Sequence, residues 1–112
     1  MSRRAVIRLV RDVRPAPQYR EFYVITVDGI RAGKLYVQSR GKKLFMSISV
    51  NVAQQGKGVG KESVRQFMRK TNMRTLYAVT RKGNLAMNRI FRKLKWRLTG
   101  GNRQNIYRWR KP

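Results

Sequence analysis

Apolar and polar residues alternate along much of the first half of the chain, which is typical of half-buried strands. Residues 11–20 contain Pro15 and Pro17 and are predicted to be extended, because proline disfavours a helix there. Asp28-Gly29 is a strong two-residue hairpin signal, since both positions need positive φ. The pattern predicts an antiparallel meander of three to four strands, at residues 5–10, 21–27, 30–38 and 44–52.

The apolar spacing changes after residue 58. Two helical faces follow, one formed by Gly60, Val64, Phe67 and Met68, the other by Met87, Ile90, Phe91 and Leu94. Asn84 stands where the second helix needs an N-cap. Short strands are predicted around these helices, at residues 75–80, 96–98 and 106–109. The second half is therefore mixed, and the whole chain is predicted to be an α+β protein.

Gly56, Gly58 and Gly60 lie between the last strand of the meander and the first helix. Glycine lets the backbone approach a ligand closely, and the free N–H groups of a first helical turn attract phosphate. A Rossmann site is disfavoured, because its glycine loop follows a first parallel strand. A P-loop is disfavoured because Glu62 stands where Ser or Thr is required. The glycine segment therefore predicts a phosphate-binding site that is neither a Rossmann site nor a P-loop.

The charge is extreme. The chain has 112 residues, with 28 Lys and Arg against 4 Asp and Glu, a net charge of +24. Such a protein attracts polyanions strongly, so nucleic acid is the expected partner. Hydrophobic residues make up 41% of the chain, enough for the core of a single domain over residues 1–112. No apolar run is long enough for a membrane span or a signal peptide, so a cytoplasmic location without membrane association is expected.

The chain has no Cys and no His, and its acidic residues are scattered: Asp12, Glu21, Asp28 and Glu62. Thiolate nucleophiles, Ser-His-Asp triads and the usual zinc sites are therefore excluded. The thin distribution of carboxylates also argues against a metal site or a paired-carboxylate mechanism. An enzyme of this composition would depend on positioning, backbone dipoles and an activated substrate.

The predicted order of elements resembles the GNAT superfamily of CoA-dependent N-acyltransferases. Its signature Gln/Arg-x-x-Gly-x-Gly/Ala follows the fourth strand, and residues 55–60, Gln-Gly-Lys-Gly-Val-Gly, match it in full. Residues 84–96 are similar to the family's Asn-x-x-Ala-x-x-Leu-Tyr-x-Lys-x-Gly-Phe element. The resemblance covers about residues 21–109. It implies a central, mostly antiparallel mixed sheet of about six to seven strands with two main helices.

The resemblance also implies a cofactor, acetyl-CoA or another acyl-CoA. In the family, the backbone of the glycine segment holds the pyrophosphate, and the preceding strand bonds the pantetheine arm. The strand backbone around Asn51 and Val52 is expected to polarise the thioester carbonyl. The predicted cofactor-binding residues are Val50, Asn51, Val52, Gln55, Gly56, Lys57, Gly58, Val59, Gly60, Lys61, Asn84 and Phe91.

Two departures from the family concern catalysis. Phe91 stands where the family often has a Tyr that acts as general acid, and its other interpretation is a core position. No Glu lies on residues 44–52, where many members place a general base. The predicted catalytic residues are Asn84, for which an N-cap role is the alternative, and Glu21 acting through a water. Other hydroxyl candidates are Ser47, Ser49, Tyr36 and Tyr77. An amine that is already deprotonated would need no strong base.

The family's first two helices, which usually wall the acceptor site, are replaced here by residues 11–20. The acceptor side is therefore expected to be open, or completed by the second subunit of a homodimer. With the positive charge, this predicts DNA, RNA or a protein of a ribonucleoprotein assembly as partner. The predicted nucleic-acid contacts are Arg65, Arg69, Arg108, Trp109 and Arg110, with a solvated helix face and an ordinary last strand as alternatives.

The sequence thus predicts an N-acetyltransferase that transfers an acyl group to an amine on a nucleic acid or a nucleic-acid-associated protein. The amine would attack the thioester directly in a ternary complex. One alternative is a GNAT-fold protein without turnover that acts as a nucleic-acid-binding module. A small basic structural protein of the ribosomal type is a third reading, and it predicts no CoA binding.

Overall fold

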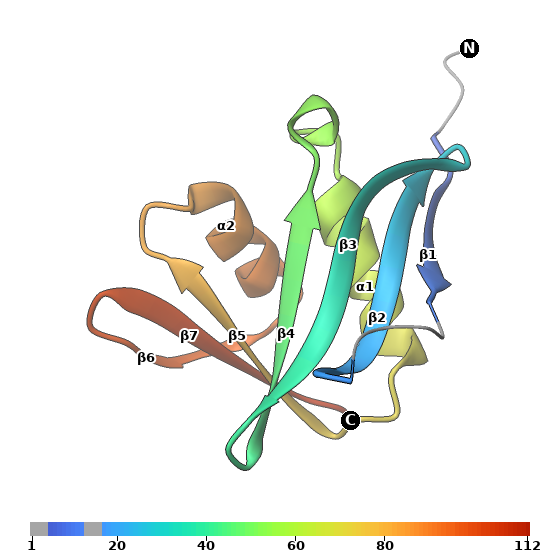
Figure 1. The fold of residues 1–112 in the computed structure, drawn as a ribbon. Helices are drawn as coiled ribbons and strands as arrows, with labels where there is room; N and C mark the ends of the chain where they lie inside the picture. Colours follow the sequence, from blue (N-terminus) through green and yellow to red (C-terminus); the bar gives the residue numbers. More distant parts are fainter. Residues whose placement is uncertain (1–4, 13–16) are drawn as a thin grey trace.

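A computed structural model describes residues 5–12 and 17–112. One twisted seven-stranded sheet has the order β1-β2-β3-β4-β5-β7-β6, and only the β4–β5 pair is parallel (Figure 1). The strands are β1 Ile7–Arg11, β2 Tyr19–Val27, β3 Ile30–Arg40, β4 Lys43–Val50, β5 Thr75–Arg81, β6 Arg97–Gly100 and β7 Gln104–Arg110. The helices are α1 Val59–Lys70 and α2 Leu85–Lys93, with a short 3-10 helix at Val52–Gln54. The predicted α+β architecture with two main helices is confirmed.

Both helices cover the same face of the sheet. On α1, the buried Phe67 ring lies 5.9 Å from the ring of Tyr23 on β2, and on α2 the Phe91 ring lies 5.1 Å from that of Tyr107 on β7. Because side chains alternate along a strand, the residues between these core positions point to the other face. That second face is called the open face below, and Figure 1 is viewed from its side. It carries, among others, Val10, Phe22, Tyr36, Phe45, Tyr77 and Arg108.

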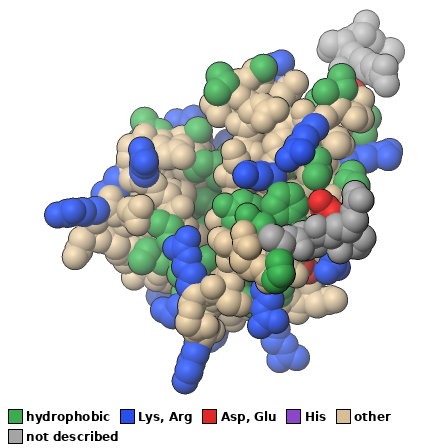
Figure 2. Space-filling view, viewed as in Figure 1, with side chains coloured by type: hydrophobic (Ala, Val, Ile, Leu, Met, Phe, Trp, Pro, Cys, Tyr) green, Lys and Arg blue, Asp and Glu red, His purple; other side chains and the backbone are tan. Residues whose placement is uncertain are grey.

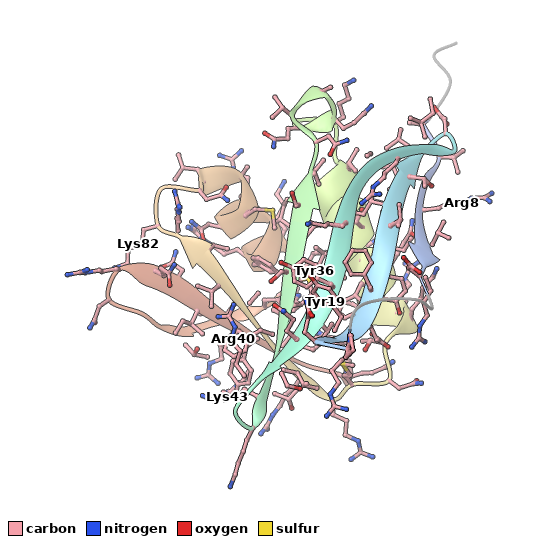
Figure 3. All side chains as sticks on the ribbon, viewed as in Figure 1. Arg8, Tyr19, Tyr36, Arg40, Lys43 and Lys82 are labelled. Atoms are coloured by element: carbon pink, nitrogen blue, oxygen red, sulfur yellow. The ribbon has the colours of Figure 1, made fainter. Side chains whose placement is uncertain are left out.

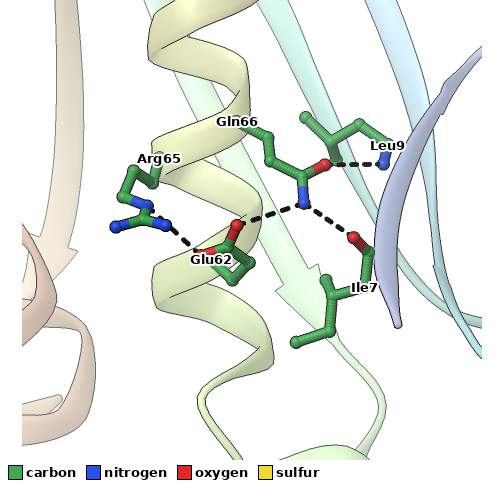
Figure 4. Close-up of polar contacts among 5 residues, drawn as sticks. All are labelled: Ile7, Leu9, Glu62, Arg65 and Gln66. Atoms are coloured by element: carbon green, nitrogen blue, oxygen red, sulfur yellow. Dashed lines mark hydrogen bonds and ion pairs between the residues drawn. The ribbon is translucent and has the colours of Figure 1, made fainter. Parts of the chain in front are cut away.

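The edge strand β1 is fastened to α1 as well as to β2. The Gln66 amide nitrogen donates to the carbonyl oxygen of Ile7 at 2.6 Å, and its oxygen accepts from the Leu9 N–H at 3.2 Å (Figure 4). Lys70 Nζ also donates to the Leu9 carbonyl oxygen, at 3.0 Å. These bonds satisfy backbone groups of the edge strand and fix α1 over the meander.

Asn88 holds α2 on β5 and β7. Its buried side-chain oxygen accepts from the Tyr107 hydroxyl at 2.9 Å, from Asn105 at 3.1 Å and from Thr80, while its amide donates to the Arg81 carbonyl oxygen at 3.2 Å. A buried network satisfied this fully specifies one placement of the helix.

Several strand boundaries differ from the sequence-based prediction. Strand β4 ends at Val50 instead of residue 52, because the chain turns into the 3-10 helix. Strand β2 begins at Tyr19, and β6 begins after Trp96, which is buried in the core. The Asp28-Gly29 hairpin is confirmed, with φ of 51° and 81°. Residues 13–16, with Pro15, lie outside the described residues. No helix in the described ranges is long and apolar enough to cross a membrane.

Candidate functional site

The candidate site is a cleft where β4 and β5 diverge. In the described part of the chain these strands pair only at Phe45 and Tyr77, so the sheet opens beyond this pair. The start of α1 and the α2 helix border the opening, and the cleft has a volume of about 610 Å³. Its lining consists of Ile48, Ser49, Val50, Gln54, Gln55, Gly56, Gly58, Val59, Gly60, Lys61, Asn84, Ala86, Met87, Arg89, Ile90 and Lys93.

The β4 backbone directs polar groups into this cleft. The Asn51 N–H donates to the Ala32 carbonyl oxygen on β3 at 2.7 Å. Hydrogen bonding to one neighbour alternates along an antiparallel strand, so the N–H and C=O groups of Ile48 and Val50 point away from β3. The Gln55 side chain donates to the Val50 carbonyl oxygen at 3.0 Å. The Asn51 N–H is therefore occupied by β3, and the β4 donors that face the cleft belong to Ile48 and Val50. Val52 lies beyond the strand, in the 3-10 helix, and its predicted role as a donor stays a prediction.

The glycine segment shapes the second wall. Gly56 and Gly58 have φ of 79° and 77°, a region that residues with a Cβ rarely adopt. Gly58 is the N-cap of α1, with no side-chain cap hydrogen bond, so the first-turn amides of the helix remain available to a ligand. At Gly60 a Cβ would lie 3.3 Å from Ile90 Cδ1 of α2, and the absence of a side chain keeps the cleft open.

Positive charge lines the cleft on two sides. Lys61 comes from α1, and Arg89 and Lys93 come from α2. None of the described residues lining the cleft is Asp or Glu. Arg89 and Lys93 were not predicted, although they share the four-residue spacing of one helical face, which is the signal that could have found them. The combination of helix amides and cations is suited to an anion.

The structure brings together most of the predicted cofactor residues. The predicted residues that line the cleft are Val50, Gln55, Gly56, Gly58, Val59, Gly60, Lys61 and Asn84. Asn51, Val52 and Lys57 are exposed outside the lining, and Val52 is 84% exposed. The Asn84 side-chain oxygen accepts from the Met87 N–H at 3.2 Å, so its N-cap role is present. Its predicted catalytic role stays a prediction.

Two predicted contacts are wrong because the side chains are in the core. Phe91 is 2% exposed, packs on Trp96 and Tyr107, and does not line the cleft. Trp109 is 8% exposed, with its ring 6.0 Å from that of Trp96, so it cannot stack on a base. For both residues the sequence left a structural role open as the alternative, and the structure places both side chains in the core.

Glu21, the predicted catalytic base acting through a water, does not lie at the cleft, and its catalytic role stays a prediction. It shares a face of β2 with Tyr23, beneath α1, and does not line the cleft. One carboxylate oxygen is buried without a hydrogen-bond partner in the described structure. Burial raises the pKa of Glu21 above its ordinary value, although the Arg11 charge and a hydrogen bond with Tyr23 lower it. The folded protein therefore holds the proton more tightly than the unfolded chain does.

This shift has a measurable consequence for stability. An acid whose pKa is raised by folding destabilises the fold as pH rises through the ordinary and then the raised pKa. Glu21→Gln is expected to increase the free energy of unfolding at about pH 7 and to change it little at about pH 4, measured by urea denaturation. Glu62→Gln, at the accessible ion pair with Arg65, is the control and should shift stability by less than about 0.5 kcal/mol. An equal effect of Glu21→Gln at both pH values would contradict the prediction.

Comparisons with known proteins were made by sequence and by structure. No protein-family model and no curated protein matches the sequence. Among solved structures, yncA from Salmonella typhimurium, with its cofactor acetyl-CoA, superimposes with a TM-score of 0.70 at 18% identity, over 84% of this chain and 65% of that one. The ribosomal-protein-S18-alanine N-acetyltransferase from Escherichia coli gives 0.70 at 17% identity, over 87% and 72%.

A third similar structure is an acetyltransferase from Salmonella typhimurium that modifies the N-terminal serine of ribosomal protein L7/L12. Its TM-score is 0.65 at 22% identity, over 82% of this chain and 64% of that one. The chain thus spans between 64% and 72% of the lengths of these three proteins. The chain therefore has the fold of the GNAT N-acetyltransferases.

Proposed function

We propose that the protein is an acyl-CoA-dependent N-acyltransferase that modifies an amine on a nucleic acid or on a protein associated with nucleic acid. The observation that carries the proposal is the cleft between β4 and β5, bordered by the glycine segment and the unblocked start of α1. When bound, acetyl-CoA or another acyl-CoA supplies an acyl group activated as a thioester. The similar structures include one with acetyl-CoA and one with coenzyme A.

The residues of the cleft fit such a cofactor. The first-turn amides of α1 and the positive charges of Lys61, Arg89 and Lys93 suit its phosphates. The N–H groups of Ile48 and Val50 are suited to amide and carbonyl oxygens of a chain lying along β4. The missing side chain of Gly60 leaves room between α1 and α2. These features support an elongated, polyanionic ligand with an apolar and amide-containing arm.

The surroundings of the cleft favour a neutral acceptor amine. With no carboxylate in the described lining, proton removal by a nearby Asp or Glu is not available. Positive charges close to an amine lower its pKa, because they disfavour the protonated form. In a chain of net charge +24, this effect replaces a strong general base. We infer that the amine attacks directly, with the enzyme contributing position and backbone donors.

The nature of the acceptor is supported by charge and by the similar proteins. Two of those proteins act on ribosomal proteins, one on an alanine of S18 and one on the N-terminal serine of L7/L12. A charge of +24 would concentrate this protein on the same class of ribonucleoprotein surface. Both a nucleic-acid amine and a protein amine within such an assembly are consistent with this.

The direct test is thermal unfolding with and without acetyl-CoA at moderate salt. At 100 times its dissociation constant, acetyl-CoA is expected to stabilise the fold by about 2.7 kcal/mol. Lys61→Gln should weaken this binding about tenfold, because it removes a charge from the cleft. Lys57→Gln removes the same charge from an exposed position outside the lining and should change affinity by less than about twofold. Mass analysis of RNA and ribosomal proteins after incubation with labelled acetyl-CoA would then identify the acceptor.

A nucleic-acid-binding module without turnover is the second candidate. It is favoured by Phe91, which stands at the family's Tyr position and is buried without a hydroxyl group. This candidate predicts a thermal shift with an oligonucleotide and none with acetyl-CoA. That result would overturn the acyltransferase proposal. Stabilisation by acetyl-CoA that Lys61→Gln weakens and Lys57→Gln leaves intact would support it.

A further inference from the structure

The open face of the sheet has no helix over it in the described part of the chain. Both α1 and α2 lie on the opposite face, and the open face is the side seen in Figure 2. Hydrophobic side chains gather near its centre, and Lys and Arg side chains are distributed around them. A sheet face of this composition that no described helix covers indicates a surface that meets a partner.

Five aromatic residues of this face form two groups. Tyr19, Phe22 and Tyr36 make the first group, with the Tyr36 ring centroid 4.8 Å from that of Tyr19 and 5.8 Å from that of Phe22. Phe45 and Tyr77 make the second group, with centroids 5.6 Å apart. All five are only partly buried, so the rings hold each other in place and still reach solvent. Figure 3 shows Tyr19 and Tyr36 side by side near the middle of the sheet.

Cations are placed over these rings. Lys34 Nζ lies 5.8 Å from the centroid of Tyr36, the Arg40 guanidinium 5.0 Å from that of Phe45, and Lys43 Nζ 4.8 Å from that of Tyr77. Arg108 pairs in register with Tyr77 across β5 and β7 and so shares its face. Three of the five rings, those of Tyr36, Phe45 and Tyr77, therefore have a positive charge within 6 Å of their centroids, an arrangement that suits bases and phosphates together.

Acidic residues are nearly absent from this surface. Glu21 lies beneath α1, Glu62 is on α1, and Asp28 is in the hairpin, where its carboxylate accepts from the Val6 N–H at 2.9 Å. Asp12 follows the open-face residue Val10 by two positions and so shares this face, at its β1 edge, where its N–H donates to the Phe22 carbonyl oxygen at 2.8 Å. A second copy of the chain is a poor occupant, because two such basic faces would repel each other. The positive charge of the open face favours a polyanion as its partner.

We propose that the open face binds a single-stranded nucleic acid, with bases stacked on its aromatic residues and phosphates held by its Lys and Arg residues. The strand would pass over Phe45 and Tyr77, the pair beyond which β4 and β5 diverge into the cleft. This deepens the proposed function, because it brings a nucleic acid or its bound protein next to the acyl group. The binding itself does not depend on acyl transfer. The surface also differs from the α1 stripe of Arg65 and Arg69 that the sequence suggested.

A charge-matched comparison tests the location. Binding of a fluorescently labelled oligothymidylate and oligouridylate is measured by anisotropy in the absence of acetyl-CoA. Lys43→Gln with Arg108→Gln, on the open face, is expected to weaken binding at least about tenfold and to reduce the salt slope by about 1.4. Arg65→Gln with Arg69→Gln removes the same charge from α1, where Arg65 already pairs with Glu62 at 3.2 Å. This pair should weaken binding less than about threefold. Equal losses for the two pairs would overturn the proposal.

Aromatic variants test stacking separately from charge. Tyr36→Leu and Tyr77→Leu keep an apolar side chain but remove the ring, and each is expected to weaken binding about tenfold with an unchanged salt slope. Tyr36→Phe and Tyr77→Phe keep the ring and should bind like the unmodified protein. Circular dichroism checks that each variant is folded. The proposal is overturned if the Leu and Phe variants bind alike. It is also overturned if sedimentation shows a dimer that the open-face variants dissociate.

The proposal of nucleic-acid binding on the open face and the acyltransferase proposal can fail independently of each other. Failure of oligonucleotide binding on this face leaves acetyl-CoA binding in the cleft untouched. Failure of acetyl-CoA binding leaves the open face as a nucleic-acid site. Ultraviolet crosslinking of a 5-iodouridine oligonucleotide, mapped by mass spectrometry, gives an independent location. Crosslinks at Tyr19, Tyr36 or Tyr77 support the proposal, and crosslinks confined to α1 contradict it.

Discussion

Replacing Gly33 with alanine is expected to lower the free energy of unfolding by about 3 kcal/mol, the upper end of the usual cost of overpacking. A Cβ at this position would lie 2.1 Å from the Ser49 carbonyl oxygen and 3.0 Å from Val50 Cα. Both obstacles are backbone atoms, so no side-chain rotation relieves the clash. Strand β4 would have to move away from β3 at the point where it enters the cleft. Urea denaturation measures the loss.

The reason for glycine at residue 33 is space and not a positive φ. Gly33 pairs with Ile25 on one side and Val50 on the other, next to a β-bulge between β2 and β3. The bulge increases the local twist and brings β4 close. Gly83→Ala is the matched control, because nothing lies within 4 Å of its added Cβ and its φ is ordinary. It should change stability by less than about 0.5 kcal/mol. Equal stability of the two variants would contradict the prediction.

The loop and hairpin could be predicted because their chemistry is local. Asp28-Gly29, Gly56 and Gly58 carry backbone requirements that few other residues meet. The strand–loop–helix order around them was enough to indicate the fold that the similar structures share. The contact between Gly33 and Ser49 was not predictable in this way, since it depends on how closely β3 and β4 approach.

The faces of the second half could not be assigned from the sequence. Alternation in β7 separates Tyr107 and Trp109 from Arg108 and Arg110, but it does not say which set lies under a helix. The packing of α2 decides this, through Asn88 and Phe91, and it buries Tyr107 and Trp109. The predicted Arg108 and Arg110 thus lie on the open face, while the predicted aromatic contact at Trp109 does not.

The open face itself needed the tertiary structure. Its five aromatic residues come from four strands, β2, β3, β4 and β5, and are spread over residues 19–77. Phe45 and Tyr77 are adjacent because β4 and β5 form the one parallel pair among the described strands, although α1 lies between these strands in the sequence. The sequence offered Tyr36 and Tyr77 only as hydroxyl candidates in place of a general base, and that role stays a prediction. Their position on the open face supports the stacking role proposed above.

The largest effect on ligand binding is expected from Gly60→Leu. The α-carbon of Gly60 faces α2, and an added Cβ would lie 3.3 Å from Ile90 Cδ1, 3.9 Å from Val50 Cγ2 and 4.0 Å from Met87 Sδ. Leucine would therefore extend between α1, α2 and the end of β4 and fill the cleft. The stabilisation by acetyl-CoA, about 2.7 kcal/mol at 100 times the dissociation constant, should disappear in thermal unfolding.

Gly60→Ala is the matched control. Its single methyl group meets only flexible side-chain ends, and alanine in place of a helical glycine stabilises by about 0.5–1 kcal/mol, so the fold and most acetyl-CoA binding should persist. Gly60→Leu should leave oligonucleotide affinity unchanged, because Gly60 is on α1 and the open face is on the other side of the sheet. If Gly60→Leu keeps the acetyl-CoA shift, the cleft is not the cofactor site. If acetyl-CoA and oligonucleotide binding are lost together in a folded variant, the two ligands share one site, and the proposal of a nucleic-acid site on the open face that is distinct from the cleft is wrong.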